Sequence, residues 1–260
     1  MPYLDRPDGA RLYYRDEGAG PIVVLVHGGT GTGDYDWEYL RPALSGRFRV
    51  ISPDTRGHGR SSDPRWLLGL ETMGQDILAL IEEIGGRPAV LVGFSMGGNA
   101  LLRLLSEQPG MADVFVGIGL SVRGDAERLP GQDAGPWPRE LIALEHEHGE
   151  GDDHWRRLRE RMGSSWVDDL SLDAGDLARI TLPTLVVCGD RDAVEPVERS
   201  VALARALPAG ELLVLPRCGH FAIRDRPAEF AVALTGFVDR HLTVDRRPSE
   251  AAADSRPGAR

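Results

Sequence analysis

The chain has 260 residues, with 40 acidic and 30 basic side chains and a formal net charge of -10. Clustered basic residues drive binding to nucleic acids and to anionic membrane surfaces, so this balance argues against both as main partners. No run approaches the roughly 20 consecutive apolar residues that a membrane-spanning helix needs, and the polar start lacks the core of a signal peptide. We therefore expect a cytoplasmic chain whose partner is a small, neutral or weakly charged molecule.

The composition also excludes several kinds of covalent and metal chemistry. Two cysteines, Cys188 and Cys218, are too few for a disulfide framework and do not lie in a metal-binding spacing, so we expect both to be reduced and unliganded. The sequence contains no lysine. Its absence excludes a Schiff-base lysine and the lysine of a phosphate-binding loop.

The expected elements alternate between strands and helices after an N-terminal hairpin. Extended stretches near Tyr3 and Leu12 flank the turn residues Pro7, Asp8 and Gly9, which predicts the hairpin. Short, mostly β-branched runs predict buried strands of a parallel sheet at residues 22–26, 49–52, 89–92, 114–120 and 185–188. Helical spacing predicts helices at residues 37–44, 73–84, 97–105, 198–207 and 228–241. This alternation predicts a doubly wound α/β sheet, in which functional residues gather where strands end and helices begin.

The alternation is interrupted at residues 122–181. This segment carries many charges, three tryptophans, several prolines and helix-like pieces, and we interpret it as an insertion between two strands of the sheet. The core then comprises residues 1–121 and 182–242. Residues 243–260 are rich in proline, serine, alanine and charge, which predicts a disordered C-terminal tail.

The sequence Gly93-Phe94-Ser95-Met96-Gly97 follows a strand-like run and opens a helix, the context that a G-x-S-x-G nucleophile elbow requires. The glycines leave room for a sharp turn around the serine, and the helix N-terminus stabilises negative charge that develops beside it. With 32 glycines in the chain, a chance match is the alternative interpretation. The strand before the motif argues against that alternative.

A second glycine-rich segment, residues 27–31, follows another strand-like run and leaves the sheet at the same edge. Such a loop can direct backbone amides at a developing oxyanion, and by position we assign one donor to Gly29 and the other to Met96. The alternative is an ordinary glycine-rich turn. His27, at the start of the segment, is interpreted as structural rather than catalytic.

A serine nucleophile needs a base to remove its proton. Seven histidines are present, and His220 is the candidate because its loop follows the strand-like residues 212–215 at the correct end of the sheet. His58 lies in a turn near the start of the chain. The remaining alternatives lie in the insertion: His146, His148 and His154.

The base in turn needs a carboxylate to hold its tautomer and stabilise its cation. Asp190 and Asp192 both follow the strand-like residues 185–188. We choose Asp192, because the later residue projects from the loop rather than from the strand end. Asp125 is a weaker alternative.

The motifs HGG, DTRGHGRSS, GFSMGG, GDRDAVEP and GCGHF occur in the order and spacing of the α/β-hydrolase superfamily. Over residues 1–242 the chain resembles its small single-domain members, most of all enol-lactonases and small esterases. The resemblance implies an α/β-hydrolase fold, with a mostly parallel, doubly wound sheet flanked by helices and residues 122–181 as a short helical lid. It also implies a nucleophile, an acid, a base and two oxyanion donors: Ser95, Asp192, His220, Gly29 and Met96.

The resemblance further implies a hydrolase of carboxylic esters, lactones or thioesters, which acts on small apolar substrates through an acyl-enzyme on Ser95 without a cofactor or metal. Phe94 and Phe221 border the triad and are expected in the pocket wall, with Trp137 and Leu141 of the lid as further candidates. The acidic, histidine-containing run at residues 145–154 is interpreted as a solvated charge run rather than a metal site.

Two alternatives to this function stay open. The same triad could serve a C–C bond hydrolase, a lyase or a cyclase, or the fold could belong to a non-catalytic ligand-binding protein. In the preferred interpretation the partner is a small-molecule acyl substrate, with neither nucleic acid nor membrane involved. A homodimer is left open.

Overall fold

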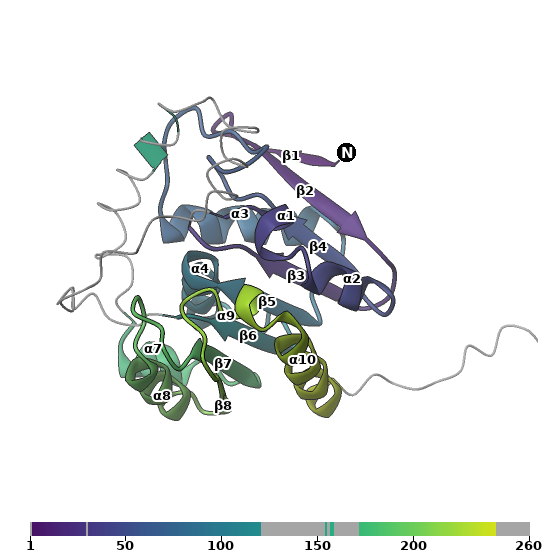
Figure 1. Ribbon diagram of the computed structural model, residues 1–260. Helices are drawn as coiled ribbons and strands as arrows, with labels where there is room; N and C mark the ends of the chain where they lie inside the picture. The colour runs from purple at the N-terminus through teal and green to yellow at the C-terminus, as the bar shows by residue number, and fades with distance from the viewer. Residues whose placement is uncertain (1, 30, 121–153, 155–156, 159–171, 243–260) are drawn as a thin grey trace, which may run out of the picture.

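A computed structural model describes residues 2–29, 31–120, 154, 157–158 and 172–242 of the chain. Within them, eight strands form one sheet in the order β1-β2-β4-β3-β5-β6-β7-β8 (Figure 1). The pairs β1·β2 and β2·β4 are antiparallel, and all other pairs are parallel. The strands are β1 (Tyr3–Asp5), β2 (Arg11–Glu17), β3 (Ile22–Val26), β4 (Arg49–Pro53), β5 (Val90–Phe94), β6 (Val114–Ile118), β7 (Thr184–Gly189) and β8 (Gly210–Leu215).

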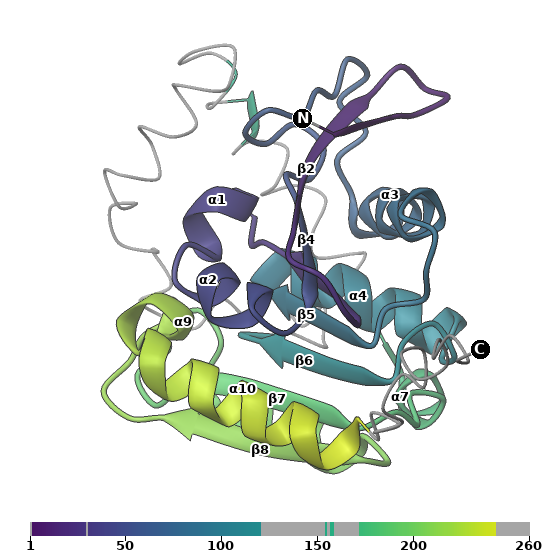
Figure 2. The ribbon, with the colours of Figure 1, turned by 90° about the vertical axis from the view of Figure 1, so that its right-hand side faces the viewer.

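Helices cover both faces of the sheet. One buried cluster packs α3, α4, α7 and α8 against one face, and a second packs α2 and α10 against the other (Figure 2). This arrangement confirms the predicted α/β-hydrolase fold with its mostly parallel, doubly wound sheet. The described helices are α1 (Gly33–Asp36), α2 (Leu40–Ser45), α3 (Leu70–Glu83), α4 (Ser95–Glu107), α7 (Ala174–Ala178), α8 (Val197–Ala206), α9 (Ala222–Asp225) and α10 (Pro227–His241).

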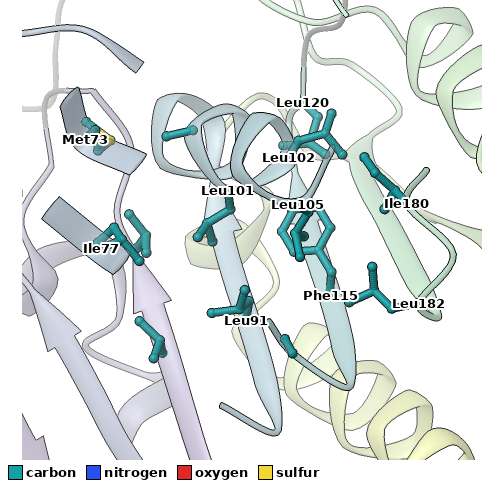
Figure 3. Close-up of a cluster of buried hydrophobic side chains, with 14 of the residues drawn as sticks. Met73, Ile77, Leu91, Leu101, Leu102, Leu105, Phe115, Leu120, Ile180 and Leu182 are labelled. Atoms are coloured by element: carbon teal, nitrogen blue, oxygen red, sulfur yellow. The ribbon is translucent and has the colours of Figure 1, made fainter. Parts of the chain in front are cut away.

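Helix α4 is held in place by its apolar face. Leu101 and Leu105, one turn apart, point toward Leu91 of β5 and Phe115 of β6, and all four are fully buried (Figure 3). Burial of each such side chain stabilises the fold by about 1.5–3 kcal/mol. The packing therefore fixes the helix whose first residue is Ser95.

The structure differs from the predicted helix at residues 37–44. A short helix, α1, ends at Asp36, and a separate helix, α2, starts at Leu40. Proline lacks a backbone N–H, so Pro42 is accommodated only in the first turn of a helix. A continuous helix from Trp37 would need that missing N–H to bond the carbonyl of Glu38, and the chain turns instead.

The N-terminal hairpin is confirmed by antiparallel pairing of β1 and β2. It is tied to the rest of the protein by Arg56, whose side chain is only 2% exposed. Its guanidinium contacts Asp76 of α3 at 2.6 and 2.9 Å and Asp8 of the hairpin turn at 3.0 Å. Arg56 therefore joins three parts of the chain at the segment that also carries His58.

Most of the predicted lid, residues 122–181, and the whole predicted tail, residues 243–260, lie outside the described residues. Of the lid span, α7 is described, and Leu177 packs into the core. His154 is also described, with Nε2 2.8 Å from the carbonyl oxygen of Gly57. The division into core, lid and tail stays a prediction. None of the helices that the structure describes is long and apolar enough to cross a membrane.

Removal of the Asp76 carboxylate is expected to destabilise the protein severely. Asp76→Ala leaves the buried Arg56 guanidinium without its bidentate partner, which costs about 3–5 kcal/mol of unfolding free energy. Asp113→Ala is the control, because Asp113 and its partner Arg87 are about half exposed (46% and 50%) and such pairs contribute about 0–1 kcal/mol. Urea unfolding measures both losses, and equal losses would contradict a structural role for Arg56.

Candidate active site

The site is organised around a sharp turn between β5 and α4. Ser95 is the first residue of α4 and has a φ of 48°, a strained value for a residue other than glycine. A Cβ on Gly93 would lie 2.7 Å from the backbone nitrogen of Gly98, and one on Gly97 would lie 2.7 Å from the carbonyl oxygen of Val26. Only glycines permit this approach, so the predicted elbow geometry is present.

The structure brings Ser95, Asp192 and His220 into contact. His220, between β8 and α9, places Nε2 3.0 Å from Ser95 Oγ and Nδ1 2.8 Å from Asp192 Oδ2. A carboxylate only accepts hydrogen bonds, so the imidazole proton lies on Nδ1, and Nε2 is free to accept the serine proton. The arrangement is that of a nucleophile, a base and an acid that orients the base.

The geometry also separates the two candidate carboxylates. Asp192 Oδ1 accepts the backbone N–H groups of Val194 and Glu195, each at 2.8 Å, which leaves Oδ2 directed at His220. Asp190 instead accepts the backbone N–H of Cys218 at 3.2 Å. The choice of Asp192 therefore agrees with the contacts. The third candidate, Asp125, lies outside the described residues.

Gly119 is a site residue that the sequence analysis missed. It follows β6 directly, has a φ of +60°, and an ideal Cβ there would lie 2.8 Å from Cε1 of His220. The imidazole thus rests against a backbone position that has no room for a side chain. The available signal was a glycine directly after a buried strand, which often marks a close approach.

Gly119→Ala is expected to lower kcat by about a hundredfold, because displacement of a catalytic group by about 1 Å has an effect of that size. The new methyl group meets the His220 ring, and the backbone conformation is strained as well. Gly110→Ala is the matched control, since a Cβ there meets nothing within 4 Å. Steady-state kinetics with circular dichroism checks the effect, and unchanged kcat in a folded Gly119→Ala protein would contradict it.

The glycine loop that follows β3 lies against the elbow. An ideal Cβ on Gly28 would lie 2.7 Å from Cδ1 of Phe94 and 3.5 Å from Cβ of Ser95. Within the described residues, the N–H groups of Gly28 and Gly31 donate to Asp36 and to the carbonyl oxygen of Gly28, and no such bond is formed by the N–H of Gly29. Met96 is in the first turn of α4, where backbone N–H groups have no partner within the helix. Both predicted oxyanion donors are thus beside Ser95 in the chain or in space, and their role stays a prediction.

Two other histidines occupy the interior beneath this loop. His27 and His58 are both fully buried, and burial lowers the pKa of His27 to about 4 and that of His58 to about 3. His58 contacts Thr55 and the carbonyl oxygen of Gly29. Its contacts place it with the loop backbone rather than with Ser95. His154, the described member of the remaining alternatives, contacts Gly57.

The predicted pocket residues have different surroundings. Phe94 is 2% exposed, and its ring centroid lies 5.1 Å from that of His220 and 5.5 Å from that of Phe221. Its ring therefore packs against the imidazole. Phe221 is partly buried. Trp137 and Leu141 lie outside the described residues, and the composition of the pocket wall stays a prediction.

The buried, uncharged His27 predicts a pH-dependent stability. Its pKa in the fold, about 4, lies below the ordinary 6.5, so between these values the unfolded chain binds the proton preferentially. Stability is full above pH 6.5 and is lost as the pH falls, by about 3 kcal/mol at pH 4. His27→Asn removes this titration, so urea unfolding should show the stability advantage of the unmodified protein shrinking from pH 7 to pH 4. A constant difference would contradict the assignment.

A family model described as the alpha/beta hydrolase family matches residues 23–233. The chain belongs to this family. The matched residues include the elbow, the acid loop and the loop that carries His220. The match leaves out residues 1–22, which include the hairpin, and residues 234–260, which include the second half of α10.

Two relatives that share most of the length are named as a deacetylase and a hydrolase. The chain is 27% identical over 261 residues to pyrrolizixenacetamide deacetylase of Xenorhabdus hominickii, covering 88% of this chain and 95% of the relative. It is 25% identical over 267 residues to 2-hydroxy-6-oxo-6-(2'-aminophenyl)hexa-2,4-dienoic acid hydrolase of Metapseudomonas resinovorans, covering 92% and 91%. These matches identify the chain as an α/β-hydrolase enzyme.

Solved structures show the same fold. Est816, an N-acyl homoserine lactone degrading enzyme, matches with a TM-score of 0.77 at 26% identity, covering 91% of this chain and all of that chain (100%). A meta-cleavage product hydrolase from Pseudomonas fluorescens IP01 matches with a TM-score of 0.76 at 22% identity, covering 90% and 96%, and shows the fold alone. The present chain therefore shares its architecture with enzymes that act on different substrates.

Proposed function

We propose that the chain is a cofactor-free serine hydrolase of carboxylic esters, lactones or thioesters that acts on small apolar substrates. The observation that carries the proposal is the series of contacts from Asp192 through His220 to Ser95, at 2.8 and 3.0 Å. Each atom in that series has the donor or acceptor role that acyl transfer requires. The substrate is a small molecule that reaches Ser95 from the loop side of the sheet.

In the first half of the reaction, Oγ of Ser95 attacks the acyl carbon while Nε2 of His220 takes the hydroxyl proton. The carbonyl oxygen becomes an oxyanion that accepts hydrogen bonds from the N–H groups of Gly29 and Met96. Collapse of this intermediate breaks the bond to the alcohol or thiol, which leaves with the proton from His220. Asp192 stabilises the imidazolium during the transfer.

In the second half, water attacks the acyl-enzyme and His220 takes one of its protons. The second tetrahedral intermediate collapses to the carboxylic acid, and Oγ of Ser95 recovers its proton from His220. Each oxyanion donor contributes about a hundredfold to a thousandfold in rate. The N-terminus of α4 adds a favourable field for the negative charge in both halves.

Named relatives support acyl transfer to water. One is a deacetylase that matches 88% of this chain, and another is an enzyme that degrades N-acyl homoserine lactones, with a TM-score of 0.77. Removal of an acetyl group and opening of a lactone share the tetrahedral oxyanion that the elbow and glycine loop suit. The ester, lactone or thioester class therefore fits the machinery and part of the relatives.

A second candidate, hydrolysis of a C–C bond, is favoured by one specific observation. The relative from Metapseudomonas resinovorans, a dienoic acid hydrolase, matches 92% of this chain. In such a reaction the leaving group is a carbon acid that must receive a proton from the enzyme. Product analysis separates the candidates. Ester cleavage releases an alcohol and thioester cleavage a thiol, whereas C–C cleavage releases the protonated carbon acid. Incorporation of labelled oxygen from water separates both of them from a lyase or cyclase.

Ser95→Ala is expected to abolish turnover and labelling by a fluorophosphonate while the fold is retained. Oγ of Ser95 is the atom that both reactions modify, and no other hydroxyl is in contact with His220 in the described part of the chain. Mass spectrometry of the labelled peptide and an ester, lactone and thioester panel provide the measurements. A fluorophosphonate adduct elsewhere, or full turnover in Ser95→Ala, would overturn the proposal.

Asp192→Asn is expected to lower kcat by about ten-thousandfold, because the amide stabilises the wrong tautomer of His220. Asp190→Asn is the matched control, since the Asp190 carboxylate accepts a hydrogen bond from the backbone N–H of Cys218 and not from His220. Its expected loss is within about tenfold. Equal losses for the two variants, measured with the same substrate, would contradict the assignment of the acid.

A further inference from the structure

The glycine loop poses a physical problem for the proposed chemistry. Oxyanion donors accelerate a reaction only when they are oriented in advance. Glycines adopt many backbone conformations, so the sequence Gly28-Gly29 does not by itself fix the direction of an N–H group. The orientation must come from contacts with the surrounding protein, and two buried side chains supply them.

The first contact comes from Asp36, the last residue of α1. Its side chain is almost fully buried (3% exposed), and Oδ2 accepts the backbone N–H of Gly28 at 2.8 Å. The loop wraps closely around this carboxyl, because an ideal Cβ on Gly31 would lie 2.7 Å from Cγ of Asp36. Oδ1 has no hydrogen-bond partner in the described part of the chain. The carboxyl thus holds the peptide group that joins residues 27 and 28.

The second contact comes from His27. Its Nε2 accepts the backbone N–H of Thr55 at 2.8 Å, so the imidazole proton lies on Nδ1. Nδ1 is 2.6 Å from the carbonyl oxygen of Gly28 and donates to it. The N–H of Gly31 donates to the same oxygen at 3.1 Å. The peptide group that joins residues 28 and 29 is therefore held through its carbonyl.

His58 lies beside these contacts but does not hold the loop by a hydrogen bond. Its Nδ1 lies 2.9 Å from the carbonyl oxygen of Arg56 and 3.1 Å from the hydroxyl of Thr55. A carbonyl oxygen only accepts hydrogen bonds, so the single proton of the neutral ring lies on Nδ1. Nε2, 3.2 Å from the carbonyl oxygen of Gly29, therefore has no proton to donate to it.

We propose that Asp36 and His27, together termed the loop clamp, are positioning residues that orient the N–H of Gly29 toward the oxyanion. Two successive peptide groups are each held by one clamp residue. In a planar trans peptide the C=O and N–H point in opposite directions, so a carbonyl of Gly28 fixed toward His27 directs the N–H of Gly29 away from it. This inference rests on the proposed function, because Gly29 must receive the oxyanion.

The charge state of Asp36 suits this position and guides the choice of variants. Burial raises the pKa of Asp36 to about 7, while the bond from Gly28 and the charges of Arg224 and His220 act in the opposite direction. With this pKa, about half of the carboxyl groups are uncharged at neutral pH, which reduces the negative charge beside the oxyanion. Asp36→Asn therefore keeps the acceptor oxygen for Gly28 in an uncharged side chain, whereas Asp36→Ala removes it.

The test compares two pairs of variants. Asp36→Ala and His27→Gln each remove one clamp contact, because the glutamine amide reaches the Nε2 position but not the Nδ1 position. Asp36→Asn and His27→Asn each keep a group at the required place. We expect Asp36→Ala and His27→Gln to lower kcat by about ten- to a hundredfold with KM unchanged. Asp36→Asn and His27→Asn should retain most of the kcat of the unmodified protein.

The affinity for a transition-state probe distinguishes loss of oxyanion binding from general loosening of the fold. A trifluoromethyl ketone forms a tetrahedral oxyanion adduct with Ser95, so its affinity should fall by the same factor as kcat/KM in Asp36→Ala and His27→Gln. Asp54→Ala is the matched control, because Asp54 is equally buried but accepts the N–H groups of Gly33 and Arg60 instead. It should lose stability in urea without this correlated loss.

The outcomes separate the clamp from the chemistry. If the unmodified protein shows neither turnover nor fluorophosphonate labelling of Ser95, the proposed function fails and the clamp loses its role with it. If the unmodified protein turns over and is labelled, but Asp36→Ala and His27→Gln bind the ketone as tightly as it does, only the clamp is overturned. Correlated losses in Asp54→Ala as large as those in Asp36→Ala would also overturn it.

Discussion

The close approach between β5 and the start of α4 is the constraint on which the rest of the site depends. Gly93 and Gly98 touch backbone to backbone, and this contact forces Ser95 into a left-handed conformation with a φ of 48°. The strain persists because the leucines of α4 are fully buried on the sheet. One turn therefore exposes the hydroxyl, directs a helix N-terminus at it and leaves space for the glycine loop.

The parallel sheet assembles the other groups around that turn. The carboxyl ends of β3, β6, β7 and β8 lie along one edge, and each delivers one component: the glycine loop, Gly119, Asp192 and His220. Parallel strands end at the same edge, so residues more than a hundred positions apart meet without a long excursion of the chain. The hydrogen bond between Ser95 and His220 spans 125 positions.

Local patterns in the sequence identified part of this arrangement. Ser95 and His220 were predicted because each follows a recognisable strand, and the doubly wound sheet followed from the alternation of strands and helices. Asp192 was a choice between neighbours, since a sequence does not show which carboxylate faces the imidazole. Gly119 was missed because its partner, His220, is distant in sequence and its importance lies in the absence of a side chain. Asp36 was missed because a sequence does not show which carboxyl accepts a backbone N–H. Prediction also failed at residues 37–44, where one missing donor at Pro42 divides the helix.

The position of β8 at the end of the sheet has a consequence for how firmly the candidate base is held. Among the described strands, β8 pairs only with β7, and Leu212 and Val214 on it are 38% and 37% exposed. The loop that carries His220 begins where this edge strand ends, and strands at an edge open at lower free-energy cost than central ones. Ser95, by contrast, follows the central strand β5. We therefore expect heat to displace the loop of His220 before it opens the central sheet, so that activity is lost before the fold.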